Sequence, residues 1–220
     1  MRNKFQRLKN KKSRTVSSNR WLLRHVNDVY VKMSKMDGYR SRSAYKLIEI
    51  NDKFKLIKEN SVVLDLGAAP GGWSQVIGNI IEKEKGGICV SIDLLPIESI
   101  KNVIAIQKDF YDEDLMQVIK DSSGKEIFDV VLSDMSPNTT GVSSVDHIRI
   151  MDLCERIFFM CDKILQKGGS FVCKIFQGGA ETSLLSLIKK RFKVVRHFKP
   201  KSSRSASKEM YLIASGFDEK

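Results

Sequence analysis

Aspartates stand at the ends of short apolar runs in this sequence. Asp65, Asp93, Asp109 and Asp134 close or follow runs rich in Val, Ile and Leu, a pattern that predicts buried strands. Because ligands bind beyond the carboxyl ends of parallel strands, we expect these acids at one rim of a sheet. A carboxylate after the second run can bind ribose hydroxyls, and one after the third can accept from an adenine amino group. Together they predict a site shaped for adenosine.

A glycine-rich turn follows the first apolar run, at residues 67–72. Glycine and alanine at these positions let the backbone approach a ligand closely. Gly67 is followed by two alanines and a proline, so the G-x-G-x-x-G fingerprint of dinucleotide-binding proteins is absent. This absence disfavours a nicotinamide-dependent oxidoreductase. The glycines alone leave an ordinary tight turn as the alternative.

The elements that must hold these residues alternate along the chain. Apolar runs predict strands over 61–66, 88–93, 103–106, 128–134, 169–176, 192–198 and 209–214. Amphipathic patterns predict helices over 72–84, 112–120, 146–166 and 181–191, with earlier helices over 21–35 and from Ser43 to Phe54. This alternation predicts an α/β fold, in which helices cover both faces of a mostly parallel sheet.

The excess positive charge of the chain is concentrated at its N-terminus. The net charge is +12, yet residues 1–27 hold nine lysines or arginines and no acid, so the remainder is nearly balanced. A second basic cluster spans 189–204. Such clusters attract the phosphates of nucleic acids. We expect a disordered basic arm over 1–19, for RNA binding or alternatively for mitochondrial targeting, and a single domain over 20–220.

Composition disfavours several other classes of protein. No apolar run approaches the roughly 18 residues of a transmembrane helix, and no secretory signal pattern follows the basic start. We therefore expect a cytoplasmic protein that does not enter the membrane. Buried reduced thiols, rather than disulfides or a metal site, are expected of the four cysteines, Cys89, Cys154, Cys161 and Cys173, and three scattered histidines add no metal cluster.

Residues 65–75, with the sequence DLGAAPGGWSQ, resemble the cofactor loop of class I methyltransferases and, in this longer form, that of the FtsJ/RrmJ family of RNA ribose methyltransferases. Further blocks resemble the same family in the same order; they are 39–47, 93–96, 108–110, 133–138, 171–178 and 199–211. The resemblance covers about residues 20 to 214. It implies a Rossmann-like class I methyltransferase fold with a seven-stranded sheet whose last strand is antiparallel.

The same resemblance implies a reaction and the residues that perform it. Family members transfer a methyl group from S-adenosyl-L-methionine to a ribose 2′-hydroxyl and release S-adenosyl-L-homocysteine. Related bacterial enzymes modify a uridine in the large-subunit (23S) ribosomal RNA, so a large ribosomal subunit is the expected partner. The catalytic set carried over by resemblance is Lys46, Asp134, Lys174 and Glu209. The cofactor-binding set is Gly71 and Trp73 at the methionine part, Asp93 at the ribose, Asp109 at the adenine and Asp134 near the methyl group. No metal is expected, and we expect a monomer.

Two roles for Lys174 remain open. A ribose hydroxyl must be aligned with the methyl group and must lose a proton. Lys174 is the candidate base, but a free lysine is mostly protonated at neutral pH. In the alternative, a charged Lys174 orients the hydroxyl and proton loss comes late. A pH–rate profile separates the two, because only the neutral base needs its own ionisation.

Other methyltransferases and non-enzymatic RNA-binding proteins are the alternatives to this prediction. A methyltransferase that acts on a base often carries an Asn/Asp-Pro-Pro-Tyr/Phe motif after the fourth strand, whereas Asp134 is followed here by Met-Ser-Pro. A methyltransferase for proteins or small molecules and a non-enzymatic RNA-binding module are the remaining alternatives.

Residues 136–141 form either the substrate entrance or an ordinary loop. Phosphate steering is expected of three cations near Glu209, which are Lys199, Lys201 and Arg204.

Overall fold

One seven-stranded sheet organises the molecule. A computed structural model describes residues 15–137, 140–177 and 182–218. The strands follow the order β3-β2-β1-β4-β5-β7-β6 across the sheet. Their bounds are β1 Val62–Leu66, β2 Ile88–Asp93, β3 Val103–Gln107, β4 Phe128–Ser133, β5 Leu165–Phe176, β6 Phe192–Phe198 and β7 Glu209–Phe217.

The strand directions confirm the expected fold class. Strands β1 to β5 pair in parallel with their neighbours, whereas β7 runs antiparallel to both β5 and β6. The order of strands reverses between β1 and β4, because the chain first builds outward to β3 and then returns to the other side of β1. In parallel sheets such a switch point opens a crevice at the carboxyl ends of the strands.

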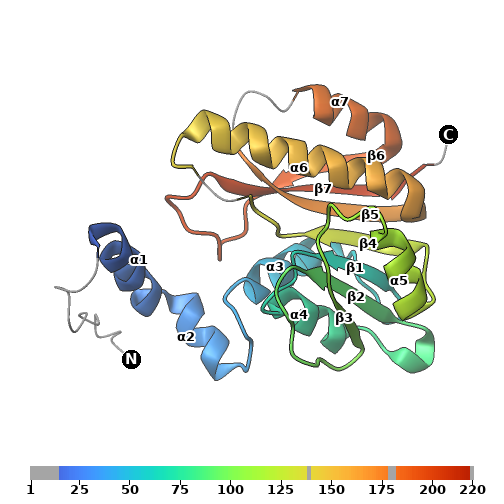
Figure 1. Cartoon of the computed structure of the whole chain (residues 1–220), viewed down its shortest axis with the longest axis horizontal. Coiled ribbons are helices and arrows are strands. Elements are labelled where there is room, and N and C mark those ends of the chain that lie inside the picture. Colours follow the sequence, from blue (N-terminus) through green and yellow to red (C-terminus); the bar gives the residue numbers. More distant parts are fainter. Residues whose placement is uncertain (1–14, 138–139, 178–181, 219–220) are drawn as a thin grey trace.

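Helices cover both faces of the sheet (Figure 1). Their bounds are α1 Val16–Asn27, α2 Val29–Met36, α3 Ala44–Phe54, α4 Gly72–Ile80, α5 Leu115–Ser123, α6 Ser143–Ile164 and α7 Thr182–Arg191, with a 3-10 turn, η2, over Lys83–Lys85. The apolar residues of α5, α6 and α7 share one core cluster, and those of α3 and α4 share the other. The helices α1 and α2 precede this layered body at one end of it.

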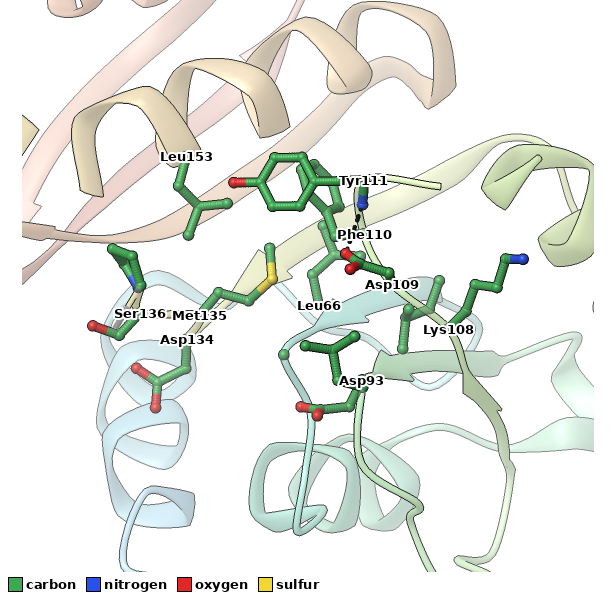
Figure 2. Close-up of a pocket in the computed structure, with 14 residues that line it drawn as sticks. Leu66, Asp93, Lys108, Asp109, Phe110, Tyr111, Asp134, Met135, Ser136 and Leu153 are labelled. Carbon is green, nitrogen blue, oxygen red and sulfur yellow. Dashed lines mark hydrogen bonds between the residues drawn. The ribbon is translucent and has the colours of Figure 1, made fainter. Parts of the chain in front are cut away.

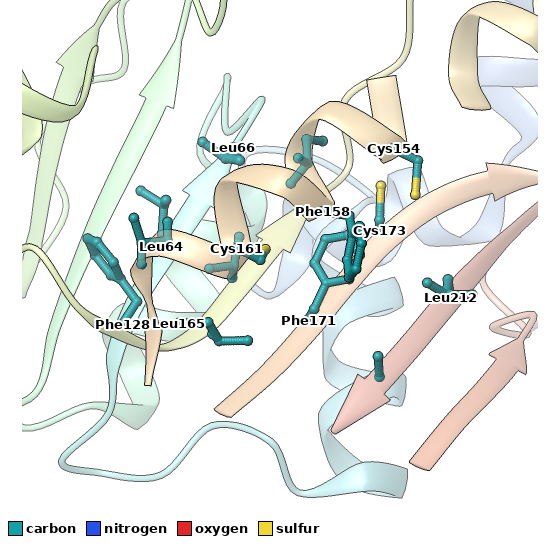
Figure 3. Close-up of a cluster of buried hydrophobic side chains, with 14 of the residues drawn as sticks. Leu64, Leu66, Phe128, Cys154, Phe158, Cys161, Leu165, Phe171, Cys173 and Leu212 are labelled. Atoms are coloured by element: carbon teal, nitrogen blue, oxygen red, sulfur yellow. The ribbon is translucent and has the colours of Figure 1, made fainter. Parts of the chain in front are cut away.

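The larger core cluster lies between α6 and the sheet (Figure 3). Cys154 and Cys161 lie apart along the buried side of α6, in the same core cluster as Phe171 and Cys173 of β5. All four cysteines are buried and free, as expected. Burial raises the pKa of the Cys161 thiol well above its usual value, so it remains neutral.

The N-terminal elements differ from the expectation in two respects. A helix begins at Val16, so the part of the expected 1–19 arm that the structure describes is already helical; residues 1–14 lie outside the described part. The single helix expected over 21–35 is two helices, because Asp28 adopts an extended backbone between them and accepts a hydrogen bond from the Tyr30 amide. An aspartate in this position ends one helix and caps the next.

The start of β5 and the cap of α3 also differ from the expectation. Strand β5 begins at Leu165 rather than at 169, because Leu165 pairs with Phe128 of β4 before an irregularity in that ladder. Ser43 precedes α3 as expected, but its side chain does not cap the helix; its hydroxyl lies 2.6 Å from that of Ser41.

No helix in the described ranges is long and apolar enough to cross a bilayer. Nor does any group of three or more His, Cys, Asp or Glu residues among the described part of the chain have an arrangement that would hold a metal ion.

Asp65 lies inside the sheet, 1% exposed, next to a short chain of hydroxyls. Ser74 of α4 donates to the Asp65 carboxylate at 2.7 Å, and Ser91 of β2 donates to Ser74 at 2.9 Å. Burial raises the pKa of Asp65 to about 7, partly opposed by the Ser74 hydrogen bond and reinforced by the charges of Asp134 and Asp93. The sheet therefore holds a carboxyl group that favours its protonated form.

This raised pKa predicts a pH-dependent stability. Between about pH 4 and pH 7 the unfolded chain has released the Asp65 proton while the folded protein keeps it, so the free energy of unfolding falls as pH rises. An Asp65→Asn variant lacks this titration. Its stability relative to the wild type should therefore improve with rising pH, by at most about 1.4 kcal/mol per pH unit. Urea unfolding of both proteins at several pH values in this window measures the difference. A difference that does not change with pH would contradict the assignment.

Candidate active site

The loop after β1 turns sharply beneath the carboxyl end of β2. The amides of Gly67 and Ala68 donate to the Ile92 carbonyl at 2.8 and 3.2 Å. The Asp93 carboxylate accepts from the Ala69 amide at 2.9 Å. Gly67 has a φ of +72°, and a Cβ atom there would lie 2.2 Å from Met135 Cγ. A glycine is required here because both the backbone conformation and the close approach of Met135 exclude a side chain.

A hollow of about 420 Å³ opens at this rim of the sheet (Figure 2). Asp93 and Asp109 lie on one side of it, and Asp134 and Met135 lie on the other. The hollow lies at the switch point between β1 and β4, as the positions of Asp93, Asp109 and Asp134 predicted. Asp65, the fourth acid expected at this rim, does not line the hollow, because it lies within β1 and its side chain accepts from a serine hydroxyl of α4. Its size falls within the range of small-molecule sites.

Backbone amides already hold the carboxylates of Asp93 and Asp109. Asp93 also accepts from the Leu95 amide at 2.9 Å, and Asp109 accepts from the Tyr111 amide at 2.9 Å. A carboxylate has about four lone-pair positions, so each can still accept from the hydroxyl or amino groups of a ligand. The backbone bonds therefore fix the direction of each acid without exhausting it.

Gly71 and Trp73, the other two predicted cofactor ligands, do not line this hollow. Gly71 has a φ of +103°, and a Cβ atom there would lie 2.8 Å from Ile100 Cδ1. Trp73 is 2% exposed, donates from Nε1 to the Ser43 carbonyl at 2.8 Å and packs against Tyr211. The structure thus gives Trp73 a place in the core, and its contact with a cofactor stays a prediction.

The four predicted catalytic side chains come together next to the hollow. The Lys46 ammonium lies 2.8 Å from a Glu209 oxygen and 3.6 Å from Asp134 Oδ2. Lys174 Nζ lies 3.2 Å from Asp134 Oδ1 and donates to the Asp134 main-chain carbonyl. Asp134 belongs to both this cluster and the wall of the hollow. Their clustering is an observation; their catalytic roles stay a prediction.

Four different elements deliver these side chains. Lys46 comes from the first turn of α3, Asp134 follows β4, Lys174 lies near the end of β5 and Glu209 begins β7. Lys46 and Lys174 are 8% and 7% exposed, so each ammonium is buried beside an acid. Two positive and two negative side chains balance at this point, which lowers the cost of burying them.

Tyr211 completes the cluster, although sequence reasoning gave it no role. It is paired with Lys174 across the β5–β7 ladder, and its hydroxyl donates to Asp134 Oδ1 at 2.6 Å. Burial, together with the charge of Asp134, raises the pKa of Tyr211 well above its usual value, so the hydroxyl remains a donor. The sequence could have indicated this position, because Tyr211 lies two residues after Glu209 on a strand, and such residues share a face of the sheet.

Asp134 is the electrostatic centre of the cluster. Burial alone would raise the pKa of this carboxyl, but the Lys174 and Lys46 ammonium groups and the Tyr211 hydrogen bond outweigh burial and lower it. Asp134 is therefore ionised at neutral pH. Its two oxygens lie between two cations, in a position to orient a hydroxyl and to hold positive charge nearby.

The three cations expected to steer phosphates have different surroundings. Lys199 donates to the carbonyls of Ser207 and Ser205, so it holds its own loop. Arg204 forms an ion pair with Asp28 at 3.5 Å and is one-third exposed. Lys201 is exposed. Lys199 and Lys201 are therefore both exposed cations, and Arg204 is partly exposed, so all three present charge to an approaching polyanion.

Comparisons with known proteins identify the family of this chain. The family model for FtsJ-like methyltransferases matches residues 39–217. The chain is 50% identical over 217 residues to the Ribosomal RNA large subunit methyltransferase E of Rickettsia africae and 51% identical to that of Rickettsia akari. In both cases the match covers 97% of this chain and 95% of the relative.

Solved structures agree in fold. A crystal structure described as a ribosomal RNA methyltransferase from Plasmodium falciparum superposes with a TM-score of 0.74 at 30% identity, over 83% of this chain and all of that one. A protein from Lactococcus lactis described as a hemolysin shares the fold at a TM-score of 0.58 and 18% identity. The family model spans the carboxylate-lined hollow and all four clustered side chains, and the chain belongs to the FtsJ-like methyltransferase family.

Proposed function

We propose that this protein transfers a methyl group from S-adenosyl-L-methionine to a ribose 2′-hydroxyl of large-subunit ribosomal RNA, with a uridine as the target. The observation that carries the proposal is the shared position of Asp134, which lines the hollow and also anchors the buried cluster of Lys46, Lys174 and Glu209. A methyl donor in the hollow and a hydroxyl at the cluster would meet at this residue. The names of the relatives, which refer to the large-subunit ribosomal RNA, support the choice of substrate.

The hollow fits the proposed donor in chemistry as well as size. S-adenosyl-L-methionine would supply a methyl group on a positively charged sulfur. Asp93 and Asp109 offer carboxylate oxygens for ribose hydroxyls and for an amino group, respectively. Asp134 brings a negative charge to the side of the hollow where the sulfonium would lie, and its lowered pKa keeps that charge at neutral pH.

The cluster would position the acceptor. A hydroxyl placed against Asp134 and Lys174 has one acceptor and one donor within reach, which fixes its orientation for in-line attack. Of the two roles for Lys174, we favour the charged one, because its nitrogen donates to the Asp134 carbonyl and lies against the carboxylate. In that role the ammonium holds the hydroxyl oxygen by a hydrogen bond, the Asp134 carboxylate compensates the positive charge that this oxygen gains as it bonds to carbon, and the hydroxyl proton then leaves to solvent.

Methyl mapping tests the proposal. The gene is deleted from its host, large ribosomal subunits are isolated, and purified protein is added with the methyl donor. A single new 2′-O-methyl group on a uridine is expected, detected as a position resistant to alkaline cleavage. Methylation of a base instead, or no methylation of ribosomal RNA by the wild-type protein, would overturn it.

A Lys174→Ala variant separates an enzyme from an RNA-binding module. The rate of methyl transfer should fall by about 10²–10³-fold, because a positioned hydrogen-bond donor in the reacting centre is removed. Binding to the subunit should persist. Lys167→Ala is the matched control. Lys167 lies at the opposite end of the same strand, β5, and its side chain is 74% exposed. Equal rates for the two variants would exclude the assigned role.

Phosphate steering by the exposed cations is tested through salt dependence. A Lys201→Gln/Arg204→Gln variant should bind RNA more weakly, and its plot of log affinity against log salt should be shallower by roughly 0.7–0.9 for each phosphate that the protein no longer neutralises. Lys58→Gln/Lys101→Gln is the control, because both residues precede strands and so lie at the opposite rim of the sheet. An unchanged slope in the first variant would count against steering.

A further inference from the structure

The loop that precedes β7 controls one member of the cluster. We call residues 199–208 the Glu209 loop; it contains no helix or strand. Ser203 in this loop is 6% exposed, and its hydroxyl donates at 2.8 Å to Glu209 Oε1. Lys46 lies 2.8 Å from the same oxygen. The direction of the Glu209 carboxylate therefore depends on where the loop holds Ser203.

Glu49 of α3 holds the loop immediately before Ser203. Its two carboxylate oxygens accept from consecutive backbone amides, Lys201 at 2.6 Å and Ser202 at 2.8 Å. Glu49 lies three residues after Lys46, so both side chains project from the same side of the helix. One helix thus places Lys46 directly and reaches Glu209 through the loop.

Asp28 holds the loop immediately after Ser203. Its carboxylate lies 3.2 Å from Arg42 Nε and 3.5 Å from Arg204 Nε, and its side chain is 9% exposed. Arg42 in turn donates to the Ser202 carbonyl and lies over the ring of Tyr30. Removing this buried carboxylate would leave two cations close together without their common partner, which is costly.

We propose that Glu49 and Asp28 are positioning residues for Glu209. They act through the Glu209 loop: by fixing the segment on both sides of Ser203, they fix the hydroxyl that orients the Glu209 carboxylate toward Lys46. Neither residue lines the carboxylate-walled hollow, so binding of the methyl donor does not depend on them. The inference rests on the proposed function for its kinetic readout but not for its structural one.

The first test is a Glu49→Gln variant. A glutamine keeps the size of the side chain but has one acceptor oxygen, so one of the two loop amides loses its partner. The rate constant for methyl transfer on large ribosomal subunits should fall about tenfold, in line with the loss of a charge-assisted hydrogen bond. The KM for S-adenosyl-L-methionine should not change. Glu59→Gln is the matched control, because Glu59 is 57% exposed and forms its ion pair with Lys85, far from the loop; its rate should equal the wild-type rate.

A double-mutant cycle tests whether Glu49 acts through Ser203. Ser203→Ala removes the hydroxyl that contacts Glu209, and it should lower the rate constant by itself. If Glu49 works through this hydroxyl, the double variant should be at most about twofold slower than the slower single variant. Fold-losses that multiply in full would overturn the inference.

An Asp28→Asn variant tests the second residue that anchors the Glu209 loop and leaves the fold intact. Asparagine caps helices as well as aspartate does, so α2 keeps its start while the charge between the two arginines is removed. The rate constant should fall with an unchanged KM for S-adenosyl-L-methionine. A wild-type rate in both Asp28→Asn and Glu49→Gln would overturn the inference.

Hydrogen exchange distinguishes failure of this inference from failure of the proposed function. If the wild-type protein methylates no ribose, the proposed function falls, yet the loop can still be probed. Amides of residues 199–209 should exchange on the order of tenfold faster in Glu49→Gln than in the wild type, since an anchoring hydrogen bond is absent. Unchanged exchange in this segment would overturn the positioning role whatever the activity.

Discussion

A balance of four buried charges constrains the functional end of this molecule. Lys46 and Lys174 are each less than a tenth exposed, and each depends on Asp134 or Glu209 to compensate its charge. Removing one member would leave an unpaired ion in a poorly solvated place, at a cost far above that of a surface ion pair. The Tyr211 hydroxyl and the Ser203 hydroxyl occupy further acceptor positions of the two acids. The cluster is therefore an element of stability and, in the proposed function, the place where the acceptor hydroxyl binds.

The sheet topology explains why these charges meet. Lys174 and Tyr211 are neighbours only because β7 inserts antiparallel beside β5, which brings the start of β7 to the same rim as the end of β5. Asp134 reaches that rim because β4 is parallel to β5. The helix α3 then covers the sheet and places Lys46 over the ends of these strands. Lys46 and Glu209 are therefore in contact although they are 163 positions apart in the chain.

Much of the fold could be predicted from local patterns, because buried parallel strands are short apolar runs with turn residues at their ends. β2 and β6 have the expected bounds, and the acids Asp93, Asp109 and Asp134 line one hollow as their positions at strand ends implied. The N-terminal break at Asp28 was not predicted, since its reason is a cap combined with ion pairs to residues far along the chain. For the same reason, the roles of Glu49 and Ser203 were not predicted. Their partners are set by tertiary contacts; Glu49 lies outside the blocks that resemble the family, and the block that contains Ser203 does not itself indicate a role for that residue. Trp73 shows the opposite case, in which a residue marked by the motif lies in the core.

Two ammonium groups, those of Lys46 and Lys174, keep Asp134 ionised despite its burial. A carbon-detected NMR titration of the side-chain carboxyl of Asp134 tests this most directly. We predict that the midpoint of this titration lies below pH 3.8, because Lys174 and Lys46 lower the pKa of Asp134 below that ordinary value. Replacing either lysine by methionine should raise the midpoint. A midpoint above pH 3.8 for Asp134 in the folded wild-type protein would contradict the account.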